Sequence, residues 1–289
     1  MKKILLILLL LSSYHERLKA QDAPNANAKK STAGKKTSEL KHPQKKAGDF
    51  AIFSKEPFDT NVDSLPIGYR GHSCIEISKR LKSFKLEKDE FEATKVYAER
   101  VEHVKTEVLY GGLSGSSILS FSPDKPMLIP RYDADTETMN VRILSHGSRS
   151  TKVDGNFYAS GLINSELSNS RNYMGENGYG KKVEIRSTAY EVCGITFINI
   201  NSISRSVVIP SEFSFKISAD DARANKGAIG VLYIATLNSP FIARYGDYAK
   251  PTMDSPIEIV WSGDSIVTRL SQVWLYSTKT GQIFSKETL

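Results

Sequence analysis

The amino-acid sequence predicts a sheet-dominated α+β fold with largely antiparallel strands, two N-terminal helices and one short late helix. Apolar and polar residues alternate over 182–186 and again over 212–217, which is the period of a strand with one buried face. An apolar run occupies 192–200 between them. Helix signals lie in 73–108 and in 218–227. We therefore expect adjoining antiparallel strands in the stretch 172–217, with helices before and after it.

The N-terminus predicts export. Two lysines precede the eight apolar residues 4–11, and that run is too short for a bilayer, which needs roughly 20 apolar residues. Residues 1–20 are therefore predicted to be a signal peptide that is cleaved after Ala20, with an uncleaved N-terminal anchor as the alternative. Cleavage would leave no transmembrane span and would place the protein in the periplasm or outside the cell.

The charge of the chain is concentrated in its first part. The net charge is +7, and residues 1–50 contain 11 Lys and Arg against 4 Asp and Glu, so the remainder is neutral. A neutral domain argues against a specific nucleic-acid partner. Residues 21–48 are rich in Lys, Ala and Ser and are predicted to be a flexible basic tail, followed by one globular domain over 49–289. The tail could also act as a tether to anionic envelope surfaces.

The early elements of the domain carry clear local signals. Residues 49–53 are expected to form a first strand. Ser73 and Glu76 have the spacing of a capping box, which predicts a helix from Cys74 to about Lys82. A second helix is expected over 88–108, where an apolar stripe recurs at helical spacing and should pack against the sheet; its members are Tyr97, Val101, Val104 and Val108.

The second helix also contains a distinctive motif. Residues 91–100 read Phe-Glu-x-Thr-x-x-Tyr-x-x-Arg after an acidic lead-in. This pattern resembles a segment of uncharacterised exported bacterial proteins, in which a similar helix precedes a strand-rich region. The cluster 172–180 is similar to the same group. The resemblance covers these two short motifs and implies no activity.

The later part of the chain is expected to contain strands and turns. Residues 145–172 are polar and are predicted to form a long connection that ends in a turn at 172–180. A short helix should start near Ser218. Three prolines at 240, 251 and 256 indicate a loop, and Gly263 with Asp264 indicates a tight turn after a strand over 257–261.

No catalytic, cofactor-binding or metal-binding residues are predicted. The sequence has no Cys-x-x-Cys, no His-x-x-x-His and no Gly-rich phosphate loop, which argues against an enzyme. The alternative is a hydrolase with a non-local site around His146, using Ser145, Asp133 or Asp135. Cys74 and Cys193 either form a disulfide or remain two separate buried thiols.

The leading hypothesis is an exported, non-enzymatic binding or structural module. Tyr and Asn side chains supply the rigid contacts and adaptable hydrogen bonds that binding loops use. The partner would be an envelope protein, a glycan or an anionic surface. The alternative is that these tyrosines only cover the sheet. The candidate recognition surface consists of Asn172, Tyr173, Asn177, Tyr179 and Tyr190.

Overall fold

The computed structural model of the chain describes residues 52–144, 149–202, 209 and 211–289. The chain divides into Met1–Gly48, which lies outside the described residues, and a second unit, Asp49–Leu289. The expected signal peptide, the basic tail, Ser145 and His146 all lie outside the described residues.

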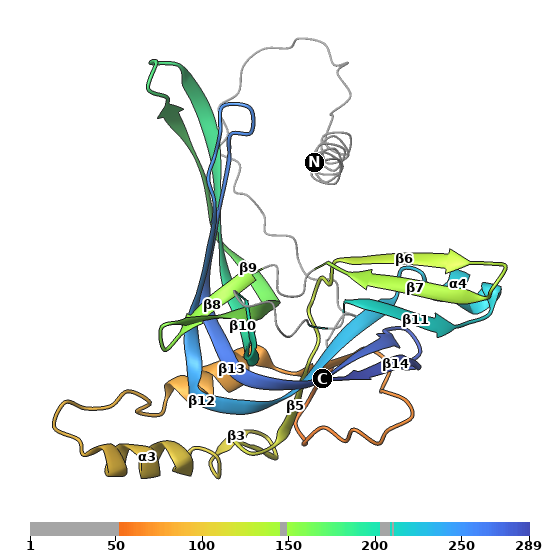
Figure 1. The fold of residues 1–289 in the computed structure, drawn as a ribbon. Coiled ribbons are helices and arrows are strands. Elements are labelled where there is room, and N and C mark those ends of the chain that lie inside the picture. Colours follow the sequence, from red (N-terminus) through yellow and green to blue (C-terminus); the bar gives the residue numbers. More distant parts are fainter. Residues whose placement is uncertain (1–51, 145–148, 203–208, 210) are drawn as a thin grey trace, which may run out of the picture. The chain divides into compact units, whose positions relative to one another are not determined.

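Three sheets make up most of the described fold (Figure 1). The largest has nine strands in the order β1-β2-β5-β12-β13-β10-β9-β8, with β14 also paired to β13. Its strands are β1 (Ile52–Ser54), β2 (Tyr69–His72), β5 (Ile118–Phe121), β8 (Arg149–Val153), β9 (Asn156–Glu176), β10 (Lys182–Asn201), β12 (Ile229–Ala249), β13 (Ile257–Ser277) and β14 (Ile283–Thr288). The smaller sheets contain β3 (Val108–Tyr110), β4 (Leu113–Ser114), β6 (Leu128–Asp133), β7 (Thr138–Ile143) and β11 (Glu212–Lys216).

The prediction of a sheet-dominated α+β fold is confirmed, since strands account for 56% of the structure and helices for 12%. Most strand pairs are antiparallel, but the main sheet is mixed: β1 pairs with β2, and β10 with β13, in parallel. The expectation that the strands of 172–217 adjoin is wrong for β11, which pairs with β7 in the three-stranded sheet. Alternation identifies the strands but does not select their partners.

Three helices have described bounds: α2 (Cys74–Lys82), α3 (Thr94–His103) and α4 (Ala219–Asn225). Serine side chains cap α2 and α4 at their N-termini, because Ser73 Oγ accepts the N–H of Glu76 and Ser218 Oγ accepts the N–H of Asp221. The expected packing of the apolar stripe holds for Val101, which is partly buried against the main core, and for Val104, but not for Val108. No residue within α3 is buried; Val104 just beyond it is buried, and Val108 is exposed.

The main core lies between the sheet, α2 and the three-stranded sheet. Ile77 and Leu81 of α2 are fully buried against sheet residues such as Ile195 and Ile266. A disulfide joins Cys74 at the start of α2 to Cys193 in β10, 119 residues later. A second, smaller cluster contains Phe58, Leu65, Tyr69, Leu232, Ile234, Trp274 and Tyr276.

His72 is a buried hydrogen-bonding centre in this fold. Its Nδ1 accepts the N–H of Ser120 at 2.8 Å, so its Nε2 carries the proton and donates to the carbonyl of Glu56 at 2.8 Å. Burial lowers the pKa of His72 below its usual 6.5. The ring is therefore a neutral link between the strands β2 and β5 and the residues that follow β1.

Two segments predicted to be connections are strands instead. The polar stretch 145–172 contains β8 and most of β9, and the turn predicted at 172–180 is confined to 177–181 because 172–176 still pair with β10. The sequence of β9 lacks the apolar alternation that is typical of a half-buried strand, because both of its faces are exposed beyond residue 164. Its hydrogen-bonded pairing with β10 overrides the low strand propensity of Ser, Asn and Gly.

The C-terminal strands also run through predicted breaks. β12 includes Pro240, where a register irregularity between Leu237 and Ile242 accommodates a residue without an N–H. β13 runs straight through Gly263. A Cβ at that position would overlap the carbonyl oxygen of Val192 in β10, so this glycine permits a close approach of two strands instead of a turn.

Candidate interaction surface

Two long hairpins project together from the rest of the described fold (Figure 1). We call the distal part of this four-stranded sheet the arm; it comprises residues 164–191 of β9 and β10 and residues 242–264 of β12 and β13. Strand β13 pairs with β10 in parallel, from Arg186 opposite Ile257 onwards, and with β12 in antiparallel orientation. The strand order across the arm is therefore β12-β13-β10-β9.

Register partners point to the same face of a sheet, so the register defines two faces of the arm. The first, which we call the Trp261 face, contains Leu167, Ser170, Asn172, Arg186, Thr188, Tyr190, Ile257, Ile259, Trp261, Asp247 and Ala249. The second, which we call the Glu258 face, contains Asn169, Arg171, Tyr173, Ile185, Ser187, Ala189, Tyr248, Glu258 and Val260.

The Trp261 face presents several apolar side chains that are exposed or half-buried. The rings of Tyr190 and Trp261 stack, with centroids 6.3 Å apart and an angle of 16° between their planes. Leu167 is 62% exposed beside them and Ile257 is 49% exposed, while Ile259 is half-buried. Apolar groups gathered on one exposed face are typical of an interaction surface.

The Glu258 face is held together by hydrogen bonds. The carboxylate of Glu258 in β13 accepts hydrogen bonds from Ser187 in β10, Tyr248 in β12 and Tyr173 in β9, so all four strands contribute. These bonds, that from Ser187 above all, lower the pKa of Glu258. The guanidinium of Arg171 lies over the ring of Tyr173, 5.7 Å from its centroid. The Glu258 carboxylate thus links side chains of all four strands on this face.

The structure distributes the five predicted recognition residues over three places. Asn172 and Tyr190 lie on the Trp261 face, and Tyr173 lies on the Glu258 face. Asn177 and Tyr179 lie in the turn at the tip, where Asn177 Oδ1 accepts the N–H of Tyr179 at 3.0 Å and the ring of Tyr179 is 97% exposed. They share the arm but not one surface.

Sequence reasoning missed the residues that β12 and β13 contribute to the arm. Ile257, Ile259 and Trp261 recur at every second position and Tyr248 precedes them, but the prolines and Gly263 indicated breaks. The alternation in 257–261 was the available signal. It identified a strand but not its parallel neighbour, because β10 and β13 are far apart in the sequence.

A hollow of about 520 Å³ lies at the base of the arm, between α2 and the sheet. Lys82 forms an ion pair with Asp264 there, with 2.8 Å between Nζ and Oδ2. Glu166 and Glu191 stand directly opposite each other in the register. The lining residues are Ile75, Ser78, Lys79, Lys82, Ser83, Asn164, Glu166, Glu191, Val192, Cys193 and Asp264. Charges of both signs line this hollow, so its electrostatics select neither cations nor anions.

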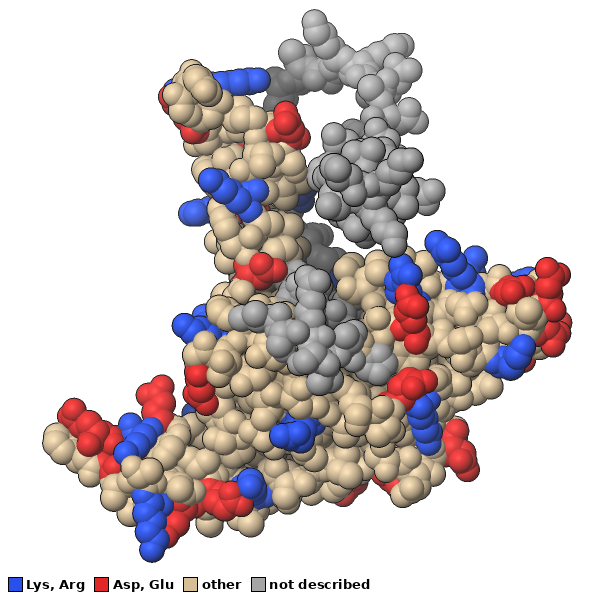
Figure 2. Space-filling model, viewed as in Figure 1, with Lys and Arg blue, Asp and Glu red and all other residues tan. Residues whose placement is uncertain are grey.

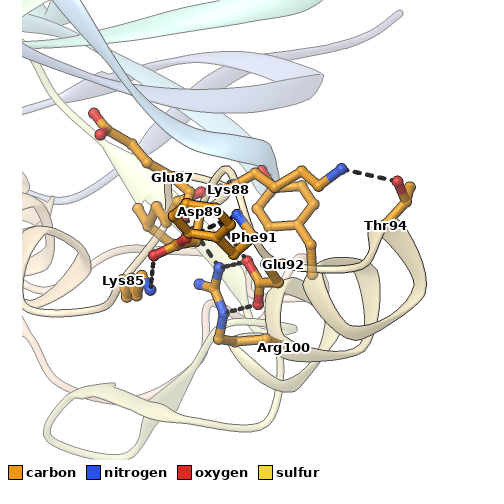
Figure 3. A network of polar contacts seen from close by, with 10 residues as sticks. Lys85, Glu87, Lys88, Asp89, Phe91, Glu92, Thr94 and Arg100 are labelled. Atoms are coloured by element: carbon orange, nitrogen blue, oxygen red, sulfur yellow. Dashed lines mark hydrogen bonds and ion pairs between the residues drawn. The ribbon is translucent and has the colours of Figure 1, made fainter.

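The motif at 91–100 forms a clamp (Figure 3). The guanidinium of Arg100 binds both carboxylate oxygens of Glu92, at 3.0 Å and 2.7 Å, and also donates to the carbonyl of Glu87 at 3.1 Å. The hydroxyl of Tyr97 donates to the carbonyl of Leu86 at 3.1 Å. The hydrogen bonds from Arg100 lower the pKa of Glu92. The motif therefore fastens the loop before α3 to the helix.

Phe91 lies in this clamped loop and is 90% exposed (Figure 3). Its N–H donates to Asp89 Oδ1, whose carboxylate also pairs with Lys85. The loop conformation is thus defined by polar contacts. The clamp gives the motif a structural role that the sequence pattern alone did not reveal.

The described residues offer no support for a metal site, since no group of three or more His, Cys, Asp or Glu among them is placed to hold an ion. Asp133 is the last residue of β6, and its Oδ1 accepts the N–H groups of Asp135 and Thr136 in the turn that follows. None of the helices in the described ranges is long and apolar enough to cross a membrane. Figure 2 shows charged side chains of both signs scattered along the arm among uncharged surface.

Comparison of the chain with models of protein families, with curated proteins and with solved structures finds no match.

Proposed function

We propose that this protein is an exported, non-enzymatic binding module and that the arm is the surface through which it contacts its partner in the cell envelope. The observation that carries the proposal is the Trp261 face, where the stacked rings of Tyr190 and Trp261 adjoin exposed Leu167 and Ile257. Exposed apolar side chains on a sheet leave apolar area in water, and an interface would bury that area.

Export is supported by two features. The basic and apolar start of the chain has the pattern of a signal peptide. The disulfide between Cys74 and Cys193 suits an oxidising compartment. The neutral charge of residues 51–289 favours a protein or glycan partner over a nucleic acid.

Site-specific photo-crosslinking in the producing cells tests the proposal. A photoreactive amino acid replaces Leu167 on the Trp261 face or Tyr179 at the tip. A matched control replaces Ile67, which is 69% exposed and lies outside the arm. We expect covalent products from the arm positions and none from the control. Equal yields at all three positions, or no product at either arm position, would contradict the proposal.

A further inference from the structure

The hollow at the base of the arm lies between two walls that are linked to each other. One wall is α2, and the other is the side of β9, β10 and β13 opposite to the Trp261 face. The disulfide between Cys74 and Cys193 joins the walls. Asp264 in β13 also accepts hydrogen bonds from Ser78 and Lys82 of α2. These links set the spacing of the walls, and the volume of about 520 Å³ lies within the roughly 300 to 1,000 Å³ of small-molecule sites.

The sheet wall presents hydrogen-bond acceptors that have no donor. Glu166 in β9 and Glu191 in β10 are register partners, and neither side chain has a hydrogen-bond or ion-pair partner among the described residues. Like charges directly opposite each other on a sheet repel. Asn164, two residues before Glu166 on the same side of β9, is only 8% exposed; its Nδ2 donates to Asp124, but no described group donates to its Oδ1. A cationic donor at this wall would remove the repulsion and bind the amide oxygen.

The helix wall presents the opposite charge. Lys79 and Lys82 lie three residues apart on α2, and both line the hollow. The ammonium of Lys82 is paired with Asp264, whereas that of Lys79 has no partner in the part of the chain that the structure describes. Two carboxylates on the sheet wall and one ammonium on the helix wall are therefore left without a counter-charge. Ile75 adds apolar lining.

We propose that this hollow binds a small ligand with a guanidinium at one end and a carboxylate at the other, as in free arginine or the C-terminal arginine of a peptide. The guanidinium lies against Glu166, Glu191 and Asn164, because its five N–H donors spread over a plane and reach several acceptors at once. The carboxylate binds Lys79. The site goes beyond the proposed function, since the two glutamates point to the side of the arm opposite to the Trp261 face.

Ligand-observed NMR titration of the full chain tests the proposal with four matched probes. L-Arginine and glycyl-L-arginine carry both charged ends, and they distinguish a free amino acid from a peptide terminus. L-Citrulline keeps the shape of arginine without the side-chain charge, and agmatine lacks the carboxylate. At least one of the first two should bind. Citrulline and agmatine should each bind at least about tenfold more weakly, because each loses a charge-assisted contact.

Single substitutions assign the contacts. Glu166→Gln and Glu191→Gln should each weaken binding of the arginine ligand at least about tenfold. Lys79→Gln should abolish the preference for that ligand over agmatine. Glu184→Gln changes an exposed carboxylate of β10 outside the hollow and should leave the affinity unchanged. Circular dichroism checks that each variant is folded.

Three results would overturn the proposal. They are the absence of binding by both arginine ligands, equal binding of citrulline or agmatine, and a loss of affinity in Glu184→Gln as large as that in Glu166→Gln. The crosslinks expected from Leu167 and Tyr179 do not depend on this ligand. Failure here would therefore leave the proposed function standing, and failure of the crosslinking would leave this site standing.

Discussion

Reduction of the disulfide between Cys74 and Cys193 should strongly destabilise the protein. The bond closes a loop of 119 residues. In the chain-entropy model, a loop of that length removes about 16 cal/mol/K from the unfolded ensemble, or about 5 kcal/mol at 25 °C. Domains are typically stable by about 5 to 15 kcal/mol, so reduction should remove a large share of the total.

The assay is urea unfolding followed by circular dichroism, with and without a phosphine reductant. We expect the unfolding free energy to fall by about 5 kcal/mol on reduction, with no deletion of side-chain atoms to complicate the comparison. The double variant Cys74→Ala and Cys193→Ala is the control, because its unfolding should not respond to the reductant. A decrease of less than about 1 kcal/mol would show that the disulfide does not restrict the unfolded chain in this way.

Three further predictions concern separate parts of the molecule. Replacing Arg100 with Lys removes the two-point contact of the clamp, so amide hydrogen exchange should accelerate in segment 86–92 but not in the main sheet. Gly263→Ala should cost about 1 to 3 kcal/mol of unfolding free energy through overlap with the neighbouring strand, whereas Gly178→Ala, which meets no atom within 4 Å, should change it by less than about 0.5 kcal/mol. Folding lowers the pKa of His72, so the contribution of the neutral ring to the free energy of unfolding is complete above pH 6.5. The free energy of unfolding should therefore fall as the pH drops through that value. A His72→Gln variant should show a flatter pH profile of that free energy in urea unfolding.

Local signals in the sequence predicted local structure well. Ser73 and Ser218 are predicted helix starts, and their hydroxyls accept the expected backbone amides. The alternation at 183–185 and 213–215 lies in strands. These features depend on side chains within a few residues of one another, so the sequence contains nearly all the information that determines them.

The arm is the part of the fold that the sequence did not predict. Its residues are paired on a sheet with two exposed faces, so β9 shows neither an apolar alternation nor strand-forming composition. Gly263 looked like a turn because the close approach of β10 is visible only in three dimensions. The recognition residues were assigned to one surface for the same reason: Tyr173 and Tyr190 lie on opposite faces of the arm, and the segment around Tyr173 was predicted as a turn.

The parallel pairing of β10 with β13 has a consequence for the order of folding. The hairpins β9–β10 and β12–β13 each join neighbouring segments, and a short turn can start either of them. The pairing of β10 with β13 joins residues about 70 positions apart, such as Tyr190 and Trp261. Forming it therefore costs the entropy of closing a long loop. We expect the two hairpins to form early and the pairing of β10 with β13 to form late. The slow step in folding would then be the pairing of the two preformed hairpins along β10 and β13.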